Sequence, residues 1–225
     1  MAFFDVDGTL WTERSVVSFY RALLEERHGL PEGAARFERF LADAAVKTAV
    51  GEGRETLNAW FYETCFRDLE VALAAKVAGS WYEARARQPG FFLEAVVRRA
   101  EEHVAVGDAV VLVSGSFREV VAPLAERIGA AHLLIAPLEE RGGVYTGRLV
   151  GKPMIGEGKA DAVRRFLEEH RFRSERCYGY GDDDTDVPFL ACVGTPTIVS
   201  PLGAPLSTYA RSRGWSVLDP SGGNL

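Results

Sequence analysis

Near its N-terminus the chain reads Phe3-Phe4-Asp5-Val6-Asp7-Gly8-Thr9-Leu10. A short apolar run that ends in an acid and is followed by glycine is typical of a strand that ends in a tight turn. Alternation along an ideal strand would send Asp5 and Asp7 to opposite faces, but the Gly8-Thr9 turn can bring both carboxylates towards one cleft. One carboxylate could then attack phosphorus while the other exchanges a proton with the leaving group. An ordinary acidic turn is the alternative interpretation.

The residues that follow are predicted to be helical. Apolar residues recur at helical spacing over residues 15–26, and His28-Gly29 with Pro31 provides a stop. The same periodicity continues to about residue 86, and Gln88-Pro89-Gly90 then ends it. We therefore predict an all-helical insertion, a separate domain of residues 12–87, between the first strand and a core domain of residues 1–11 and 88–225.

Beyond residue 88, apolar or β-branched runs alternate with helical periodicity. The run at 109–113 is apolar on both faces, as in a strand inside a parallel sheet. Alternation of this kind predicts an α/β, doubly wound core with a parallel sheet. The tail at 220–225 is expected to fray. Further strands are expected over residues 132–135, 177–180, 197–199 and 215–218, helices over 91–103, 118–128 and 159–170, and a hairpin over 143–150.

Composition excludes several classes of protein. The chain has 225 residues, 47% hydrophobic and 26% charged, so it can bury a core. Its net charge of −6 argues against a dedicated nucleic-acid binder, which needs a basic surface. We expect a cytoplasmic protein, because no run of roughly 20 apolar residues and no secretory signal pattern is present. The three cysteines form no CxxC pair and indicate neither a disulfide framework nor a zinc site.

Two further segments begin predicted helices. Ser114-Gly115-Ser116 leaves the strand at 109–113, at the sheet edge where open α/β sheets bind ligands. Its hydroxyl and amide groups could bind an anion, although a plain helix N-cap has the same pattern. Lys159 lies in the first turn of a helix, where the helix dipole favours an acid. An anionic partner is therefore expected there, unless the side chain simply faces solvent.

Residues 179–186 include the end of a predicted strand and, after it, four acids, Asp182, Asp183, Asp184 and Asp186. Acids this close repel one another unless a cation or a basic partner neutralises some of them. Oxygen ligands of this kind suit Mg²⁺, which usually takes one or two carboxylates together with waters and substrate phosphate. A solvated acidic loop or a calcium site is the alternative, but the spacing is not that of an EF-hand.

In order and spacing, these segments together resemble the haloacid dehalogenase superfamily of phosphotransferases. The sequence is most similar to subfamily IB, the phosphoserine phosphatase-like branch, and the similarity covers nearly the whole chain. The resemblance implies a Rossmann-like core with a helical cap of the C1 type inserted after the first strand. It also implies a Mg²⁺-dependent phosphomonoesterase that hydrolyses a small phosphorylated metabolite through an aspartyl-phosphate.

The resemblance implies a role for each matching residue. Asp5 would be the nucleophile, and Asp7 would be the general acid and base. Ser114 and the Gly115 amide would bind phosphate oxygens. Lys159 would neutralise charge on the nucleophile and on the transferring group.

The same resemblance implies a metal site. Mg²⁺ would be bound by Asp182, the Asp5 carboxylate and the Asp7 main-chain carbonyl. Asp186 would orient waters on the metal or Lys159. Asp183 stands where the family often has a small residue, and it is the alternative metal contact.

Two positions depart from the phosphoserine phosphatase pattern. A Glu nine residues after the nucleophile reads the substrate amino group in those enzymes, and here this position is Arg14. The cap arginine that reads the carboxylate has no clear match, since Asn58 stands near its place. We therefore expect a substrate other than phosphoserine. Arg14 either reads a second anionic group on that substrate or is a surface residue at a helix start.

Other functions and other roles remain as alternatives. A phosphomutase or phosphotransferase of the same superfamily is the alternative enzyme, and a catalytically silent phosphate-binding regulatory module is the alternative outside enzymes. The expected partner is a small-molecule phosphate ester, with no nucleic acid and no membrane span, and the sequence carries no signal for an oligomeric state. Four aromatic residues either form the core of the cap or line a pocket: Trp11, Trp60, Phe61 and Trp81.

Overall fold

The computed structural model describes residues 1–221, so most of the tail at 220–225 lies outside the described residues. The described chain forms a six-stranded and a three-stranded sheet. The large sheet contains β1 (Ala2–Phe4), β3 (Val110–Val113), β4 (His132–Leu134), β7 (Tyr178–Gly181), β8 (Thr195–Val199) and β9 (Ser216–Leu218). The small sheet contains β2 (Leu69–Glu70), β5 (Leu138–Arg141) and β6 (Val144–Leu149).

The large sheet is parallel throughout, in the order β4-β3-β1-β7-β8-β9. β1 is central and pairs with β3 on one side and β7 on the other. Every residue of β1 and β3 is buried, because helices cover both faces of the sheet. The predicted α/β fold class is confirmed.

Helices alternate with the strands of the core. The described core helices are α5 (Glu94–Ala105), α6 (Arg118–Ile128), α7 (Glu157–Glu169), α8 (Val187–Leu190) and α9 (Pro205–Ser212), with two short 3-10 helices, η1 (Ser174–Arg176) and η2 (Asp184–Asp186). Within the described residues, none of the helices has both the length and the apolar character needed to cross a membrane.

The two faces of the sheet pack against different helices. Phe4 and Leu112 point into a cluster that includes residues of α5 and α6, whereas Phe3 and Val111 point into a second cluster with α7, α8 and α9. This alternation follows from the period of two along a strand. Because β1 is buried on both faces, Asp5 emerges from it at a rigid place in the centre of the sheet.

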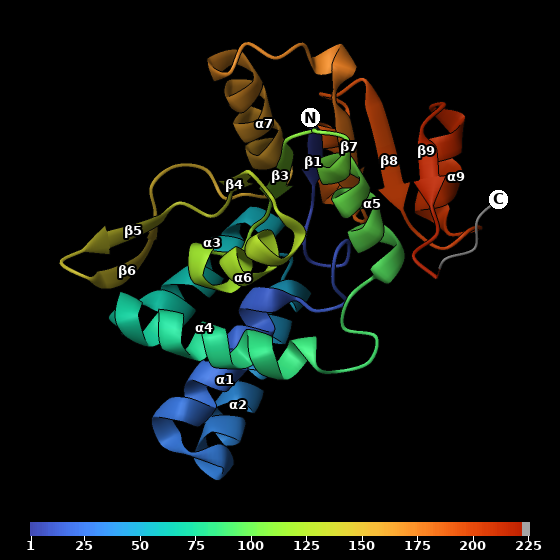
Figure 1. The fold of residues 1–225 in the computed structure, drawn as a ribbon. Coiled ribbons are helices and arrows are strands. Elements are labelled where there is room, and N and C mark those ends of the chain that lie inside the picture. Colours follow the sequence, from blue (N-terminus) through green and yellow to red (C-terminus); the bar gives the residue numbers. More distant parts are fainter. Residues whose placement is uncertain (222–225) are drawn as a thin grey trace.

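The insertion after β1 lies at the carboxyl ends of the strands, below the sheet in Figure 1. It consists of α1 (Ser15–His28), α2 (Leu30–Ala49), α3 (Arg54–Phe66) and α4 (Val71–Ala86), and the turn at Gly29 separates the first two helices as predicted. It is not wholly helical, however. β2 pairs antiparallel with β6, so the predicted hairpin extends into the insertion. A two-residue strand has no periodicity of its own, and only its distant partner reveals it.

Candidate active site

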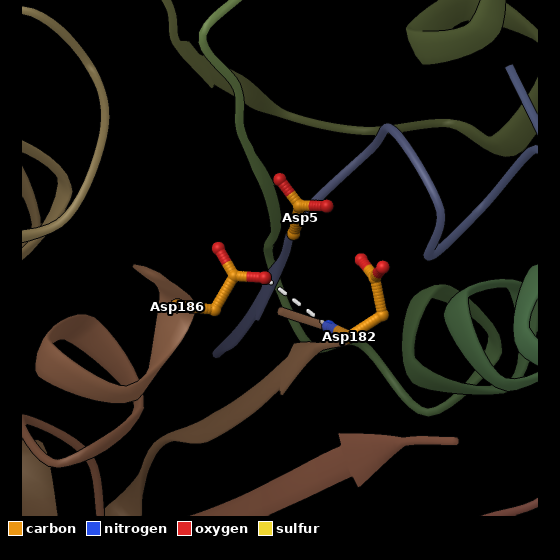
Figure 2. Close-up of side chains that lie close together, drawn as sticks. All are labelled: Asp5, Asp182 and Asp186. Carbon is orange, nitrogen blue, oxygen red and sulfur yellow. Dashed lines mark hydrogen bonds between the residues drawn. The ribbon is translucent and has the colours of Figure 1, made fainter. Parts of the chain in front are cut away.

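The carboxyl ends of β1 and β7 bring three acids together. Asp5 directly follows β1, Asp182 directly follows β7, and Asp186 ends η2. One carboxylate oxygen from each lies within 4.8 Å of the others. Figure 2 shows Asp5 and Asp182 with their carboxylates pointing to the same side. Asp186 instead accepts hydrogen bonds from the main-chain N–H groups of Asp182 and Asp183, both at 3.1 Å.

Two glycines make this close approach possible. Gly8 has φ +85°, and a Cβ there would collide with the Asp182 carboxylate. A Cβ on Gly181 would lie 2.7 Å from the Cβ of Asp186. Thr9 Oγ1 donates to Asp182 Oδ1 at 2.7 Å, which ties the turn after β1 to the end of β7. The Gly-Thr pair after Asp7 is therefore required by the packing of the site as well as by the turn.

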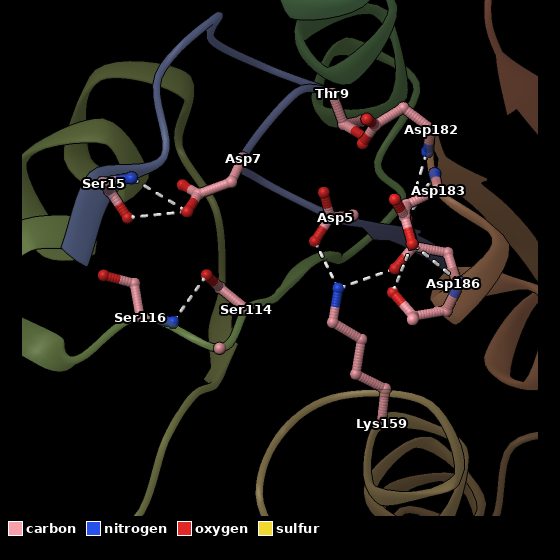
Figure 3. Close-up of polar contacts among 12 residues, drawn as sticks. Asp5, Asp7, Thr9, Ser15, Ser114, Ser116, Lys159, Asp182, Asp183 and Asp186 are labelled. Carbon is pink, nitrogen blue, oxygen red and sulfur yellow. Dashed lines mark hydrogen bonds and ion pairs between the residues drawn. The ribbon is translucent and has the colours of Figure 1, made fainter. Parts of the chain in front are cut away.

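Lys159 is the cation that faces this cluster. Its side chain is buried, and Nζ contacts Asp5 Oδ1 and, at 2.7 Å, Asp186 Oδ1 (Figure 3). Burial alone would lower the pKa of Lys159. The Asp186 and Asp5 carboxylates raise this pKa by more than burial lowers it, so the lysine stays charged. The anionic partner expected at the start of α7 is this pair of acids.

The charge of the cluster is unbalanced. Among the described residues, Lys159 is the one cation that forms ion pairs with this cluster, with Asp5 and Asp186, and Asp182 is its third acid. Burial, together with the charges of Asp186 and Asp182, raises the pKa of Asp5 well above its ordinary value, although Lys159 acts in the opposite direction. Burial and the charge of Asp186 raise the pKa of Asp182 to about 6. A second cation beside Asp5 and Asp182 would relieve both effects, and carboxylate oxygens are the ligands that Mg²⁺ prefers.

Asp7 lies beside this cluster and is held by three donors. Trp11 Nε1 donates to Oδ1 at 2.7 Å, and the Ser15 main-chain N–H and Oγ donate to Oδ2 at 2.9 and 3.0 Å. Figure 3 shows the Asp7 carboxylate turned towards Ser15, the first residue of α1. Burial raises the pKa of Asp7, and the three hydrogen bonds oppose that increase.

The segment Ser114-Gly115-Ser116 forms the loop between β3 and α6. Ser114 is buried, and its Oγ accepts a hydrogen bond from the Ser116 main-chain N–H at 3.0 Å (Figure 3). The Tyr62 hydroxyl of α3 donates to the Gly115 carbonyl oxygen. The loop thus lies across the cleft from Asp182 and contacts the insertion.

One cavity of about 430 Å³ collects these groups. Its lining includes Asp5, Asp7, Ser114, Gly115, Lys159, Asp182 and Asp186, together with apolar residues of α1 and α3. A larger cavity, of about 710 Å³, lies between β4, the β5–β6 hairpin and α7, and its lining includes none of these seven residues. The smaller cavity is therefore the candidate active site. Of the four aromatic residues considered above, Phe61 lines it, whereas Trp11 and Trp81 are buried in the core.

The roof of the cavity is a face of α3. Arg54, Asn58 and Tyr62 follow one another at four-residue spacing and all line the cavity. Arg54 forms ion pairs with Asp183 at 2.7 Å and with Asp184 at 2.8 Å. Asp183 therefore faces the insertion and caps η2, whereas Asp182 faces Asp5.

Two charged residues at the start of α1 also line the cavity. Glu13 forms an ion pair with Arg85 at 3.1 Å. Arg14 is exposed, and its side chain has no ion pair or hydrogen bond with any residue in the range 1–221. Of the cations that line the cavity, Arg14 is therefore the one without an ion-pair partner among residues 1–221.

Five residues donate side-chain hydrogen bonds to residues of the site in a way that was not predicted from the sequence. Arg54 and Tyr62 could have been found from their spacing with Asn58, which places all three on one helical face. The other contacts depend on tertiary structure, and no local pattern in the sequence indicates them. The five residues are Thr9, Trp11, Ser15, Arg54 and Tyr62.

Comparison with known proteins agrees with this geometry. The family model described as haloacid dehalogenase-like hydrolase matches residues 2–191. The chain belongs to this family. The predicted family is thus confirmed, and with it the prediction that the protein is a hydrolase.

Similar proteins place this haloacid dehalogenase-like hydrolase near phosphatases. It is 32% identical over 225 residues to phosphoserine phosphatase SerB1 of Mycobacterium tuberculosis, and the alignment covers 97% of this chain and 70% of that protein. A solved structure of a protein with unknown function from Bordetella pertussis Tohama I has a TM-score of 0.84 at 29% identity, covering 98% of each chain. A structure titled as a phospho-aspartyl intermediate analogue of phosphoserine phosphatase shares the fold, with a TM-score of 0.64 at 16% identity, covering 96% of this chain and 90% of that one.

Proposed function

We propose that this hydrolase is a Mg²⁺-dependent phosphomonoesterase that hydrolyses a small phosphorylated metabolite through an aspartyl-phosphate on Asp5. The observation that carries the proposal is the position of the Asp5 carboxylate. It lies between Lys159 on one side and Asp182 on the other, in a cavity that also contains Asp7 and Ser114. Phosphoryl transfer needs this combination, because its catalysis consists mainly of positioning and of charge neutralisation by cations.

The metal site follows from the same cluster. Asp5, Asp182 and the Asp7 main-chain carbonyl are the oxygens that we assign to Mg²⁺. Bound there, the ion would neutralise charge on the phosphoryl oxygens and on the two carboxylates. Asp186 has its oxygens committed to Lys159 and to two main-chain amides, so its role is to hold Lys159 and the loop after β7 in place. Asp183 pairs with Arg54 and is not assigned to the metal.

Hydrolysis of the ester then takes place in two steps, each carried out by residues of this chain. In the first, an oxygen of Asp5 forms a bond to phosphorus while the bond to the leaving oxygen breaks, and Asp7 gives its proton to that oxygen. In the second, water attacks the phosphorus of the aspartyl-phosphate, Asp7 takes the proton of the water, and the Asp5 carboxylate is released. Lys159, Ser114 and the Gly115 amide hold the phosphoryl oxygens throughout.

The insertion supplies the remainder of the substrate site. We assign residues 12–87 to a cap domain and residues 1–11 and 88–225 to the catalytic domain. The cap provides the roof of the cavity through α1 and α3, whose apolar residues Val16, Val17, Leu57 and Phe61 would contact the leaving group. Excluding water in this way strengthens every electrostatic interaction in the cleft.

Arg14 indicates which substrates fit. It is a cation of the cavity lining with no partner among residues 1–221, whereas Glu13 and Arg54 are paired. A phosphate ester with a second anionic group would supply that partner. Arg14→Gln should raise KM for phosphoglycerate, which carries a carboxylate, more than for glycerol phosphate, which lacks one. Arg21→Gln, on an exposed α1 arginine that pairs with Glu25, is the matched control.

The proposal is tested by measuring phosphate release with and without Mg²⁺ across a panel of esters. The panel holds phosphoserine, sugar phosphates, nucleoside monophosphates and phosphorylated hydroxy acids. We expect Mg²⁺-dependent release that is lost in Asp5→Asn. Activity that persists in Asp5→Asn, or that needs no divalent cation, would contradict the mechanism. Transfer to an added acceptor instead of release would indicate a mutase.

A further inference from the structure

In the proposed mechanism Asp7 transfers a proton, which either of its two carboxyl oxygens could hold. The hydrogen bonds of the carboxyl group distinguish the two oxygens. Oδ2 accepts two hydrogen bonds, from the main-chain N–H and the hydroxyl of Ser15 at 2.9 and 3.0 Å, whereas Oδ1 accepts one, from Trp11 Nε1 at 2.7 Å. A carboxylate offers roughly four lone-pair positions, two on each oxygen. Oδ2 is therefore fully occupied, and Oδ1 keeps one position open.

We propose that Trp11 is a positioning residue for the general acid, and that it fixes Oδ1 of Asp7 as the oxygen that exchanges the proton with the substrate. The inference rests on the proposed function. Neither the indole N–H nor the main-chain N–H can accept a hydrogen bond, so they orient the carboxyl group without competing for its proton. The open position on Oδ1 is the place where the proton is held before the first step and after the second.

The structure makes Trp11 a rigid support for this purpose. Its side chain is fully buried and packs edge-on against Trp81, with ring centroids 5.6 Å apart, and against Phe91 at 5.4 Å. Its main chain is also fixed, because the Gly8 N–H donates to the Trp11 carbonyl oxygen at 2.8 Å. An indole held in this way has one orientation, and so does the carboxyl oxygen that it binds.

Ser15 holds the other oxygen from a different element. It is the first residue of α1 and is fully buried. The carboxyl group of Asp7 is therefore fixed between the turn after β1 and the first helix of the insertion. The start of the insertion thus contributes to orienting the acid, in addition to covering the substrate.

Positioning of an acid has a signature that structural damage does not share. An alkyl phosphate needs a proton on its leaving oxygen, because an alkoxide is a strong base. A p-nitrophenyl phosphate leaves as a stable phenolate and needs little help from the acid. Asp7 serves both esters alike in the second step, whereas kcat/KM reports the first step alone. A change that disorients Asp7 should therefore lower kcat/KM selectively for alkyl esters, whereas a change that disturbs the fold should lower kcat/KM for both substrates.

The test uses Trp11→Phe, which keeps an aromatic ring in the core and removes the donor. We expect kcat/KM for an alkyl phosphate to fall about tenfold and kcat/KM for p-nitrophenyl phosphate to fall less than about twofold. Tyr145→Phe is the control, because it removes a buried aromatic donor, whose hydroxyl donates to Glu119 Oε1 at 2.8 Å, from a side chain that does not line the cavity. It should leave the ratio of the two rates unchanged. Ser15→Ala, which removes one of three donors, should shift the ratio in the same direction by a smaller factor.

The outcomes separate this inference from the proposed function. Asp7→Asn should lower kcat/KM selectively for the alkyl substrate, and if it does not, the acid role of Asp7 fails and the inference fails with it. If Asp7→Asn is selective but Trp11→Phe slows both substrates equally, or slows neither, the inference alone is wrong. A Tyr145→Phe ratio that shifts like that of Trp11→Phe would also overturn it. Should Trp11→Phe not fold by circular dichroism, the ratio for Ser15→Ala decides, and an unchanged ratio overturns the inference.

Discussion

The floor and the roof of the cavity are built in opposite ways. At the floor, Asp5, Lys159 and Asp186 are nearly inaccessible to solvent and are linked by charged hydrogen bonds. The roof is lined largely by apolar residues of α1 and α3, such as Val17, Leu57 and Phe61. Its described polar links to the floor include the pairing of Arg54 with the loop after β7 and the contact of Tyr62 with Gly115. Buried charges tolerate little change, whereas an apolar roof can be rebuilt around a different substrate. Under the proposed function, this difference means that the floor would fix the chemistry and the roof would select the ester.

The largest effect is expected at the floor. Asp5→Asn should lower kcat by about a thousandfold or more, because it would remove the proposed nucleophile. Asp184→Asn, on an exposed acid of the neighbouring loop, should lower it by less than about threefold. Steady-state phosphate release measures both. Comparable losses in the two variants would mean that the floor and the exposed loop are not distinguished by their chemistry.

A second comparison separates two adjacent acids. Asp182 faces Asp5, and Asp183 faces Arg54, so Asp182→Asn should weaken Mg²⁺ binding by about a hundredfold or more and Asp183→Asn by less than about tenfold. Isothermal titration with Mg²⁺ in the absence of substrate measures this. The reverse order would place the metal on Asp183.

Metal binding should also appear in the stability of the protein, with a defined pH dependence. The pKa of Asp182 is about 6 in the fold and near 3.8 when unperturbed, so the folded protein holds this proton more tightly than the unfolded chain does. The stability of the metal-free protein therefore falls as pH rises from about 4 through 6, and Mg²⁺ compensates for this above that range. At a hundredfold excess over its Kd, Mg²⁺ should contribute about 2.7 kcal/mol.

Differential scanning calorimetry at several pH values measures the effect. With 2–4 °C expected per kcal/mol for a protein of this size, Mg²⁺ should raise Tm by roughly 5 to 10 °C at neutral pH. The increase should shrink below about pH 5, where protons compete for Asp182. An increase that is larger in acid than at neutral pH would contradict the assignment of Asp182 to the metal.

The smallest effect is expected at the roof. Arg54→Gln removes ion pairs whose arginine is 56% exposed, so it should raise KM by about two- to fivefold and change kcat little. Arg67→Gln, at the other end of α3 and also exposed, is the control. A large loss of kcat in Arg54→Gln would show that the roof takes part in the chemistry.

Much of the core could be predicted from the sequence because its signals are local. The run at 109–113 became β3, and the helical stretch at 118–128 became α6 with the same bounds. Lys159 was identifiable because a cation in the first turn of a helix is locally unfavourable. In each of these cases the residue pattern itself reflects burial or charge.

The remainder depends on contacts between distant segments. β2 is a strand only because Leu69 pairs with Tyr145 of β6, which is distant in the sequence. Asp182 and Asp183 are adjacent acids, and in the sequence only the family resemblance favours Asp182 for the metal. Their different contacts come from the direction in which the loop turns between Thr9 and Arg54. The indole N–H of Trp11 donates to Asp7 across a turn whose geometry cannot be read from the amino-acid sequence. Such contacts become predictable only once the fold is known.

The most direct test of the mechanism is to trap the phosphoryl group on Asp5. The protein is mixed with Mg²⁺ and its best ester, quenched within one turnover and treated with borohydride, which reduces an acyl phosphate to an alcohol. Peptide mass mapping then locates the modified residue. We expect the reduced side chain at Asp5 and no modification in protein quenched without substrate. Modification at another acid, or none while turnover is fast, would contradict an aspartyl-phosphate on Asp5.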